Sequence, residues 1–338
     1  MKLITKKLWK KIKDWTKFIL AIGCVVVFVV FYVFNVWSPL KKPVNVVVPN
    51  GASVTRMTNY LYDKNIIKSK ELFYFSIRLN GGMIQAGEYD IPRGAGMWTI
   101  ANMMAHGKIA TVSVTIPEGY TVKQIKEMLM NIPYLVGDVD CKEKKPLCNL
   151  HDGDIFPDTY RIARGTSRLA LLELARNKML NVKKSFEDAR LPVPLKNFNE
   201  VITLASIVQK ETPRIKEMPI VASVYLNRLN INMRLQADPT VVYALTDGLG
   251  DMRGEPLLSG HLKIDSPYNT YRYNGLPPAP IANVGRDAIR AVLKPSHTKY
   301  LFFVADGRGG HRFSKDYSEH QMHHEKWRKI KKNKIDDK

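Results

Sequence analysis

A glutamate at the end of an apolar helix is the residue with the clearest capacity for chemistry in this sequence. Residues Leu204–Pro213 read LASIVQKETP, and Glu211 closes a run that is otherwise mostly apolar or small. At about 3.6 residues per turn, Leu204, Ile207 and Val208 share one face of this helix, and the glutamate falls on that same face. Because burying a carboxylate removes its hydration, the group must either pair with a cation or hold its proton through a raised pKa.

Two roles for Glu211 therefore stay open. In a functional role, an apolar pocket raises its pKa toward neutrality and the residue acts as a general acid. In a structural role, the carboxylate forms a salt bridge with one of three arginines that follow it in the sequence, namely Arg214, Arg228 and Arg234.

The helix that carries this glutamate is predicted from its end signals. Asn197 is suited to cap the first turn, and Glu200 follows three residues later, where its side chain can reach back. Thr212 and Pro213 end the helix, because proline cannot continue the backbone hydrogen-bond ladder. A second amphipathic helix is predicted through residues 221–229.

Polar and aromatic side chains gather among turn residues after these helices, as a sugar-binding cleft requires. They occur in the stretches MRLQADPTV, SPYNTYRYNGLPPAPIANVG and YLFFVADGRGGHRFS. Asp238 precedes a proline, so it fits a turn or a helix cap as well as contact with a ligand. The residues that we expect to line the cleft are Gln236, Asp238, Asn269, Tyr271 and His311.

The start of the chain predicts a membrane segment. Residues 18–37 form an apolar run whose only strongly polar member is Asn35, and the run is long enough to cross the hydrocarbon core of a bilayer. A cleaved signal peptide would have a shorter apolar region followed by small residues at a cleavage site. Seven lysines precede the run and only Lys41 and Lys42 follow it closely, so the positive-inside rule places the N-terminus in the cytoplasm.

Three similar patterns occupy the region 44–135. Each has a β-branched run, the triplet Pro-X-Gly and then an amphipathic segment with helical spacing, and they begin near Val46, Asp90 and Thr115. Proline fixes φ at the first turn position, and glycine supplies the positive φ that directs the chain into the helix. The patterns predict a small α/β domain, and they also resemble LysM-like modules, which bind N-acetylglucosamine chains.

Charge and composition narrow the function classes. The chain has 338 residues and a formal net charge of +21, with a pI near 9.7, so an anionic partner is expected. Basic residues are not concentrated on one helix or interleaved with aromatics, and nucleic-acid binding is therefore not expected. His320, His323 and His324 lack the acidic pattern of a metal site such as HExxH, so we expect a solvated basic terminal helix, no metal and no cofactor.

The cysteines leave one question open. Cys24 lies inside the apolar N-terminal run, whereas Cys141 and Cys148 lie in a polar, lysine-rich stretch. In an oxidising compartment the latter two could close a small loop as a disulfide, and two unpaired thiols fit the sequence equally well.

At these motifs the sequence resembles the MltG (YceG-like) family of endolytic murein transglycosylases. The resemblance runs in order through FPDTY, LASIVQKET, VASVYLNRL, MRLQADPTV, YNTY, GLPPAPI and FVADGRGGH. It implies cleavage of the β-1,4 bond between N-acetylmuramic acid and N-acetylglucosamine in peptidoglycan, leaving a 1,6-anhydromuramic end, with Glu211 as the catalytic acid. The family usually has a glutamate where Gln209 stands, which leaves Glu211 as the only carboxylate in the motif. Relatives often carry Glu in place of Asp152, whose role stays open.

The resemblance also implies an organisation and partners. The expected fold class is α+β, with a basic cytoplasmic N-terminus at 1–17, a single transmembrane helix at 18–37 and a LysM-like strand–turn–helix region at 44–135. A mixed α/β catalytic domain at 150–330 holds the acid at the end of a buried helix, and residues 331–338 form a basic tail. The expected partners are peptidoglycan glycan strands, the cytoplasmic membrane that anchors the chain, and peptidoglycan synthases, with the catalytic domain outside that membrane.

Overall fold

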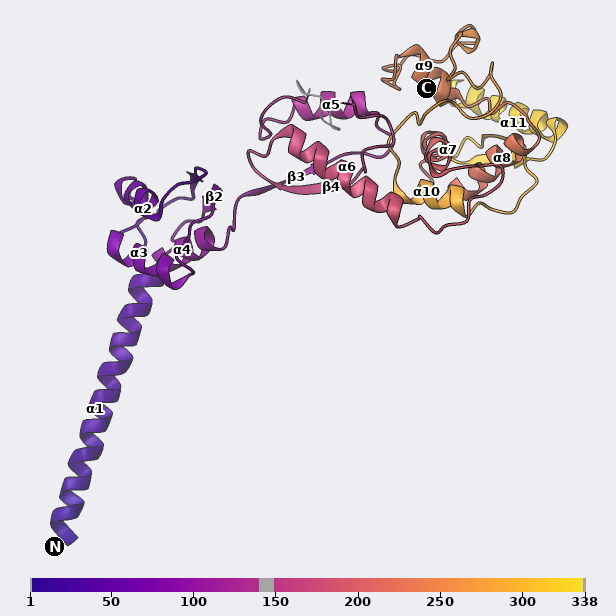
Figure 1. The fold of residues 1–338 in the computed structure, drawn as a ribbon. Helices are drawn as coiled ribbons and strands as arrows, with labels where there is room; N and C mark the ends of the chain where they lie inside the picture. Colours follow the sequence, from indigo (N-terminus) through magenta and orange to yellow (C-terminus); the bar gives the residue numbers. More distant parts are fainter. Residues whose placement is uncertain (1, 140–148, 337–338) are drawn as a thin grey trace. The chain divides into compact units, whose positions relative to one another are not determined.

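The computed structural model describes residues 2–139 and 149–336 (Figure 1). Helices dominate the described residues, and six short strands form three two-stranded sheets. The predicted α+β class and the N-terminal apolar helix are both confirmed. The chain divides into two compact units, the first comprising Met1–Val112 with Arg161–Gly165 and the second comprising Ser113–Tyr160 with Thr166–Lys338.

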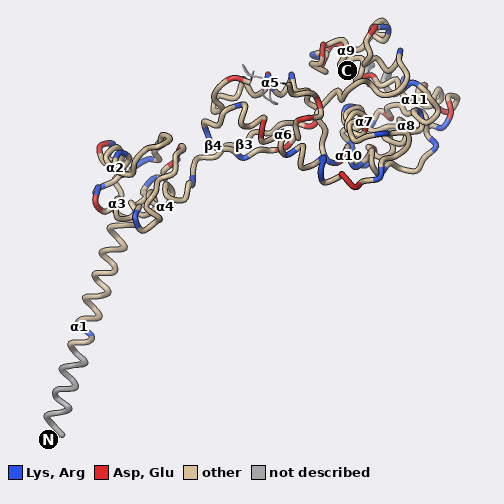
Figure 2. The backbone as a smooth tube through the Cα atoms, viewed as in Figure 1, with Lys and Arg blue, Asp and Glu red and all other residues tan. Residues whose placement is uncertain are grey.

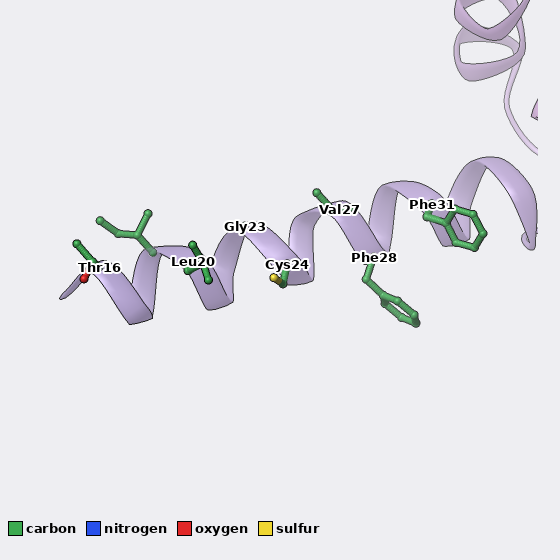
Figure 3. Close-up of a pocket in the computed structure, with 8 residues that line it drawn as sticks. Thr16, Leu20, Gly23, Cys24, Val27, Phe28 and Phe31 are labelled. Carbon is green, nitrogen blue, oxygen red and sulfur yellow. The ribbon is translucent and has the colours of Figure 1, made fainter. Parts of the chain in front are cut away.

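Helix α1, Lys2–Asn35, carries the apolar run in the first unit. Its segment Trp15–Asn35 has 21 residues and is the one helical segment of the described chain that is long and apolar enough to cross a membrane. Figure 3 shows side chains such as Leu20, Val27 and Phe31 standing off this single helix. They are exposed because no described part of the chain covers them.

The remainder of the first unit packs three helices with a small sheet. Its elements are β1 (Val44–Val48), α2 (Val54–Asp63), α3 (Lys70–Leu79), β2 (Gly87–Ile91) and α4 (Met97–Ala105). Strands β1 and β2 are antiparallel, with Val46 opposite Tyr89. Leu61, Phe73 and Tyr89 are fully buried in the core of this unit. The sequence patterns did not include α3.

The three Pro-X-Gly turns have the predicted backbone. Gly51, Gly94 and Gly119 have φ of 74°, 73° and 77°, a region that glycine enters without a Cβ penalty. Each turn leads from a strand into a helix, the third from β3 (Thr111–Thr115) into α5 (Val122–Met130). Since the unit boundary falls at Val112, this third pattern belongs mainly to the second unit, and the expected region 44–135 extends over parts of both.

The second unit is built around the helix that carries Glu211. Helices α7 (Phe198–Glu211), α8 (Met218–Asn230) and α10 (Arg286–Leu293) pack against one another, and the core includes Leu204, Ile207 and Val221. Lys and Arg are spread over many segments of this unit (Figure 2). Strand β4 (Thr159–Ala163) pairs with β3, and the boundary between the units falls within it, after Tyr160. The other elements of the second unit are α6 (Arg168–Lys184), α9 (Asp238–Leu245), a short 3₁₀ helix (His261–Lys263), the antiparallel pair β5 (Phe302–Ala305) and β6 (His311–Ser314), and α11 (Tyr317–Asp336).

Candidate active site

Helix α7 places Glu211 at its last position. The predicted start is confirmed, because Asn197 Oδ1 accepts the backbone N–H of Glu200 at 3.0 Å and Glu200 Oε2 accepts the N–H of Lys196 at 2.7 Å. Every residue from Val201 to Val208 is buried. Thr212 then adopts an extended conformation, with φ of −142°, and the helix ends as predicted.

Glu211 is partly buried and accepts one side-chain hydrogen bond. Tyr225 of α8 donates its phenolic O–H to Glu211 Oε1 at 2.8 Å. Burial raises the pKa of Glu211 to about 7, the nearby charge of Asp238 acts in the same direction, and the Tyr225 hydrogen bond and Arg228 oppose the increase. At neutral pH roughly half of the Glu211 carboxyls therefore hold a proton, compared with well under one in a hundred for an ordinary glutamate.

Within the described residues, Glu211 has no salt-bridge partner. Arg228 lies near enough to influence its pKa, but the guanidinium donates to backbone carbonyls, through Nε to Leu301 O and through Nη1 to Leu235 O, both at 2.6 Å. The structural role considered for Glu211 therefore finds no support in this geometry. The other two arginines have different partners, Arg214 pairing with Glu217 at 3.4 Å and Arg234 donating to Tyr271 O at 2.8 Å.

Asp238 and Tyr271 lie close to this carboxyl. Tyr271 donates its O–H to Asp238 Oδ1 at 2.5 Å, and Asp238 is the first residue of α9, whose N-cap is Ala237. Burial raises the pKa of Tyr271, to which the charges of Asp238 and Glu211 add. The side chain of Gln236 is exposed two residues before Asp238, on a backbone with φ of 50°. The structure thus brings Asp238 and Tyr271 together with Glu211.

Asn269 occupies a different kind of position. It is fully buried, its Nδ2 donates to Leu262 O at 2.9 Å and Ile264 O at 2.8 Å, and its Oδ1 accepts the backbone N–H of Tyr271 at 3.0 Å. The donor and the acceptor of the Asn269 side-chain amide are therefore both bonded to the backbone of the protein. The geometry therefore favours a role in holding the loop of Tyr271 over the ligand contact expected from the sequence.

His311 is held by a carboxylate that the sequence did not single out. His311 Nδ1 lies 2.9 Å from Glu217 Oε2, and the two side chains are only 15% and 16% exposed. The ring of Phe303 meets His311 edge-on at 5.2 Å between centroids and meets Tyr225 edge-on at 5.9 Å. A line of packed rings therefore connects His311 to the tyrosine that hydrogen-bonds Glu211.

Asp152 and Gln209 both tie elements of the second unit together. Asp152 accepts the N–H of Val122 at 2.6 Å and the O–H of Tyr243 at 2.7 Å, and burial raises its pKa. It lines a cavity of about 300 Å³. Gln209 Oε1 accepts the N–H of Gly285 at 3.2 Å, at the start of α10.

The remaining candidate groups lie elsewhere. Cys141 and Cys148 fall outside the described residues, so the disulfide stays a prediction. No group of three or more His, Cys, Asp or Glu residues within the described ranges is arranged to hold a metal. The histidine face of α11 is not solvated as expected, since His320 stacks on Phe302 at 5.3 Å and His323 Nδ1 lies 3.1 Å from Ser314 Oγ.

The sequence did not indicate two contributors to the site, Tyr225 and Glu217, and it indicated Arg228 only as a possible salt-bridge partner of Glu211. Arg228 falls four residues after Val224, on the apolar stripe of α8, which is the kind of signal that marked Glu211. Tyr225 reaches Glu211 only because α7 packs against α8. Glu217 reaches His311 across 94 residues of sequence, and neither side chain signals the other locally.

Fold and site together define an α+β enzyme that presents a partly buried carboxylic acid at the end of a buried helix. The chain belongs to the YceG-like family, whose model matches residues 46–326. It is 30% identical over 316 residues to a protein of Bacillus subtilis (strain 168) named endolytic murein transglycosylase, with 85% of each chain covered.

Further relatives agree with this family. A Streptococcus pneumoniae protein of the same name is 25% identical over 325 residues, which cover 85% of this chain and 58% of that one. A crystal structure of a yceG-like protein from Listeria monocytogenes is 30% identical and superposes with a TM-score of 0.50, covering 83% of this chain and 99% of that chain.

Proposed function

We propose that this chain is a membrane-anchored endolytic lytic transglycosylase that cuts the MurNAc-β-1,4-GlcNAc bond of nascent peptidoglycan strands and leaves 1,6-anhydroMurNAc ends, which terminates glycan elongation. The observation that carries this proposal is the Glu211 carboxyl, whose pKa of about 7 leaves it substantially protonated at neutral pH. Relatives named endolytic murein transglycosylase support it.

One carboxyl group suffices for this reaction. Glu211 gives its proton to the glycosidic oxygen, the bond from that oxygen to muramic C1 breaks, and GlcNAc leaves with a free 4-hydroxyl. The 6-hydroxyl of the same muramic acid forms the new bond to C1, and its proton passes to the Glu211 carboxylate. Most glycosidases need a second carboxyl to activate water or to act as a nucleophile, and this route needs neither.

The neighbours of Glu211 have distinct parts in the proposal. Tyr225 fixes the orientation of the carboxyl and stabilises the carboxylate that exists after proton transfer, because a hydrogen bond to a charged acceptor is the stronger one. Asp238 opposes ionisation and so keeps the acid protonated. We propose Gln236, Asp238, Tyr271 and His311 as glycan contacts and Asn269 as a residue that positions Tyr271.

The other parts of the chain fit a role at the membrane. We propose that α1 is an uncleaved anchor, with the seven lysines of residues 1–17 in the cytoplasm and residues 40–338 outside it. The turns and small sheet of the first unit support a LysM-like module that binds glycan. Peptidoglycan synthases are the partners to seek in a pull-down with the anchored chain.

The decisive experiment compares Glu211→Gln with the wild type on purified sacculi. We expect the wild type to release fragments with 1,6-anhydro ends, lighter by one water than hydrolysis products in mass spectrometry, and the variant to release none. Glu200→Gln is the matched control, because it makes the same change in the first turn of the same helix, at a partly exposed side chain. Equal release by Glu211→Gln would refute the catalytic role, and fragments heavier by one water would identify a hydrolase.

A further inference from the structure

Helix α1 is joined tightly to the rest of its unit through its last turns. At Gly96, the residue that caps α4, an added Cβ would collide with the backbone oxygen of Asn35, so the two backbones approach closely. The ring of Phe34 lies 6.4 Å from that of Phe75 in α3, and Val33 packs against the buried core of the unit. These contacts fix which side of α1 the helix α3 occupies (Figure 1).

An apolar face of α3 lies beside α1. Phe75 and Leu79 are four residues apart, so they share one face of the helix, and they are 52% and 59% exposed. Together with Trp98 and the α1 side chains from Val26 to Asn35, they line an apolar groove of about 410 Å³. No described element of the protein covers this face.

The groove extends far along α1. Val26 precedes Asn35 by nine residues, which is about 13 Å at 1.5 Å per residue. The apolar segment Trp15–Asn35 has 21 residues and so matches a hydrocarbon core of about 30 Å. When this segment spans a bilayer, the part from Val26 onward lies in the leaflet nearer to the folded units, and the side chains beside it lie at the same depth.

We infer that the α3 face formed by Phe75 and Leu79, together with Trp98, inserts into the outer leaflet and contacts lipid acyl chains. This inference rests on the proposed anchoring by α1. Lipid is the occupant of the groove because the α3 face continues the membrane-spanning surface of α1. A tryptophan at this level suits the interface between acyl chains and headgroups.

Basic residues lie where lipid headgroups would then be. Lys41 and Lys42 are exposed shortly after the end of α1. The backbone N–H of Gly94 donates to Leu40 O at 3.0 Å, which brings the exposed Arg93 to the same end of the unit. These cations would attract the phosphates of an anionic leaflet while the apolar face enters it.

The test measures depth in a bilayer with the full-length chain. Cys24, Cys141 and Cys148 are replaced by serine, a single cysteine is introduced by Leu79→Cys, and it is labelled with an environment-sensitive fluorophore. Vesicles of phosphatidylcholine and phosphatidylglycerol then carry bromine on the acyl chains as a quencher. Two further labelled variants serve as controls. Val26→Cys lies within α1, and Tyr60→Cys lies on α2, a helix that is farther from α1 in Figure 1. Tyr60 is 41% exposed, so a label can be attached at this position.

We expect the brominated lipid to remove most of the fluorescence at positions 26 and 79 and little of it at position 60. Quenching at position 26 without quenching at position 79 would overturn the inference and leave the proposed anchoring by α1 intact. In that case, a blue-shifted emission from the unquenched label at 79 would show that the label is shielded from water and would indicate a second copy of the chain on this face. No quenching at position 26 would overturn both the inference and the proposed anchoring by α1. Release of anhydro-ended fragments by the same labelled proteins tests the catalytic proposal separately.

Discussion

The hydrogen bond from Tyr225 to Glu211 makes a prediction about the pH range of the enzyme. Replacing the donor by Tyr225→Phe removes a bond that favours the ionised carboxylate, so the pKa of Glu211 must rise further above its ordinary value. A hydrogen bond to a charged group contributes about 1.5–3 kcal/mol, which corresponds to roughly one to two pKa units. The pKa should therefore move from about 7 to about 8–9.

The direction in which the pH profile moves depends on the protonation state of Glu211 that starts the proposed reaction. The protonated carboxyl is present below its pKa and is lost as the pH rises through it, so the alkaline limb of activity should move up by one to two pH units in Tyr225→Phe. At pH 9, the variant should keep a larger share of its own maximal rate than the wild type keeps. Its maximal rate should fall, because the carboxyl loses the group that orients it.

The assay follows anhydro-ended fragments released from sacculi between pH 5 and pH 10 at constant ionic strength. Tyr160→Phe is the matched control, since Tyr160 is also buried but donates to the backbone oxygen of Phe156 and not to a carboxylate. Its alkaline limb should stay in place. A Tyr225→Phe limb that does not move, or that moves toward lower pH, would show that Tyr225 does not control the proton of Glu211.

Three further predictions concern stability and the identity of the acid. Glu211→Gln should change the free energy of unfolding in urea more favourably at pH 8 than at pH 4, by up to about 3 kcal/mol. The reason is that the raised pKa of Glu211 makes the wild type gain stability as the pH falls from 7 toward 4.5. A difference between variant and wild type that does not depend on pH would contradict the assignment of a buried acid. Asn269→Ala should cost about 1–3 kcal/mol in urea unfolding, since it leaves the carbonyls of Leu262 and Ile264 without their donor, and a cost near zero would mean that the amide has no positioning role. Gln209→Glu introduces the glutamate that the resemblance to the family implies at this position and should retain the proposed transglycosylase activity, whereas adding Glu211→Gln in that background should abolish release of anhydro-ended fragments; activity in the double variant would assign the acid to position 209.

Local signals made much of this molecule predictable. The cap at Asn197, the proline stop after Glu211 and the three turn glycines each depend on a few neighbouring residues, and the structure has them where the sequence placed them. The apolar stripe of α7 likewise indicated that Glu211 would be at least partly buried. These features follow from backbone geometry and helical periodicity, which a short segment specifies by itself.

Contacts between distant segments were beyond that reasoning. Glu217 contacts His311 because β6 packs near the start of α8. Asn269 is buried where its amide donates to nearby backbone carbonyls, such as that of Leu262. From the sequence we expected Asn269 and Tyr271 to have the same role, yet Asn269 is buried in its loop and Tyr271 lies beside the acid. Which polar side chain faces a ligand is decided by tertiary packing, and composition alone does not carry that information.

The place of Glu211 on the last turn of α7 has an electrostatic consequence. Backbone dipoles in a helix add up along its axis and leave a partial negative charge of about half an elementary charge at the C-terminal end. A carboxylate formed there meets that field at its least favourable point, so the helix itself helps to keep the proton on the acid. In the proposed reaction, where the glycosidic oxygen takes the proton from Glu211, the same field would favour the return of a proton from the 6-hydroxyl of the sugar, and the helix end would restore the acid for the next cleavage.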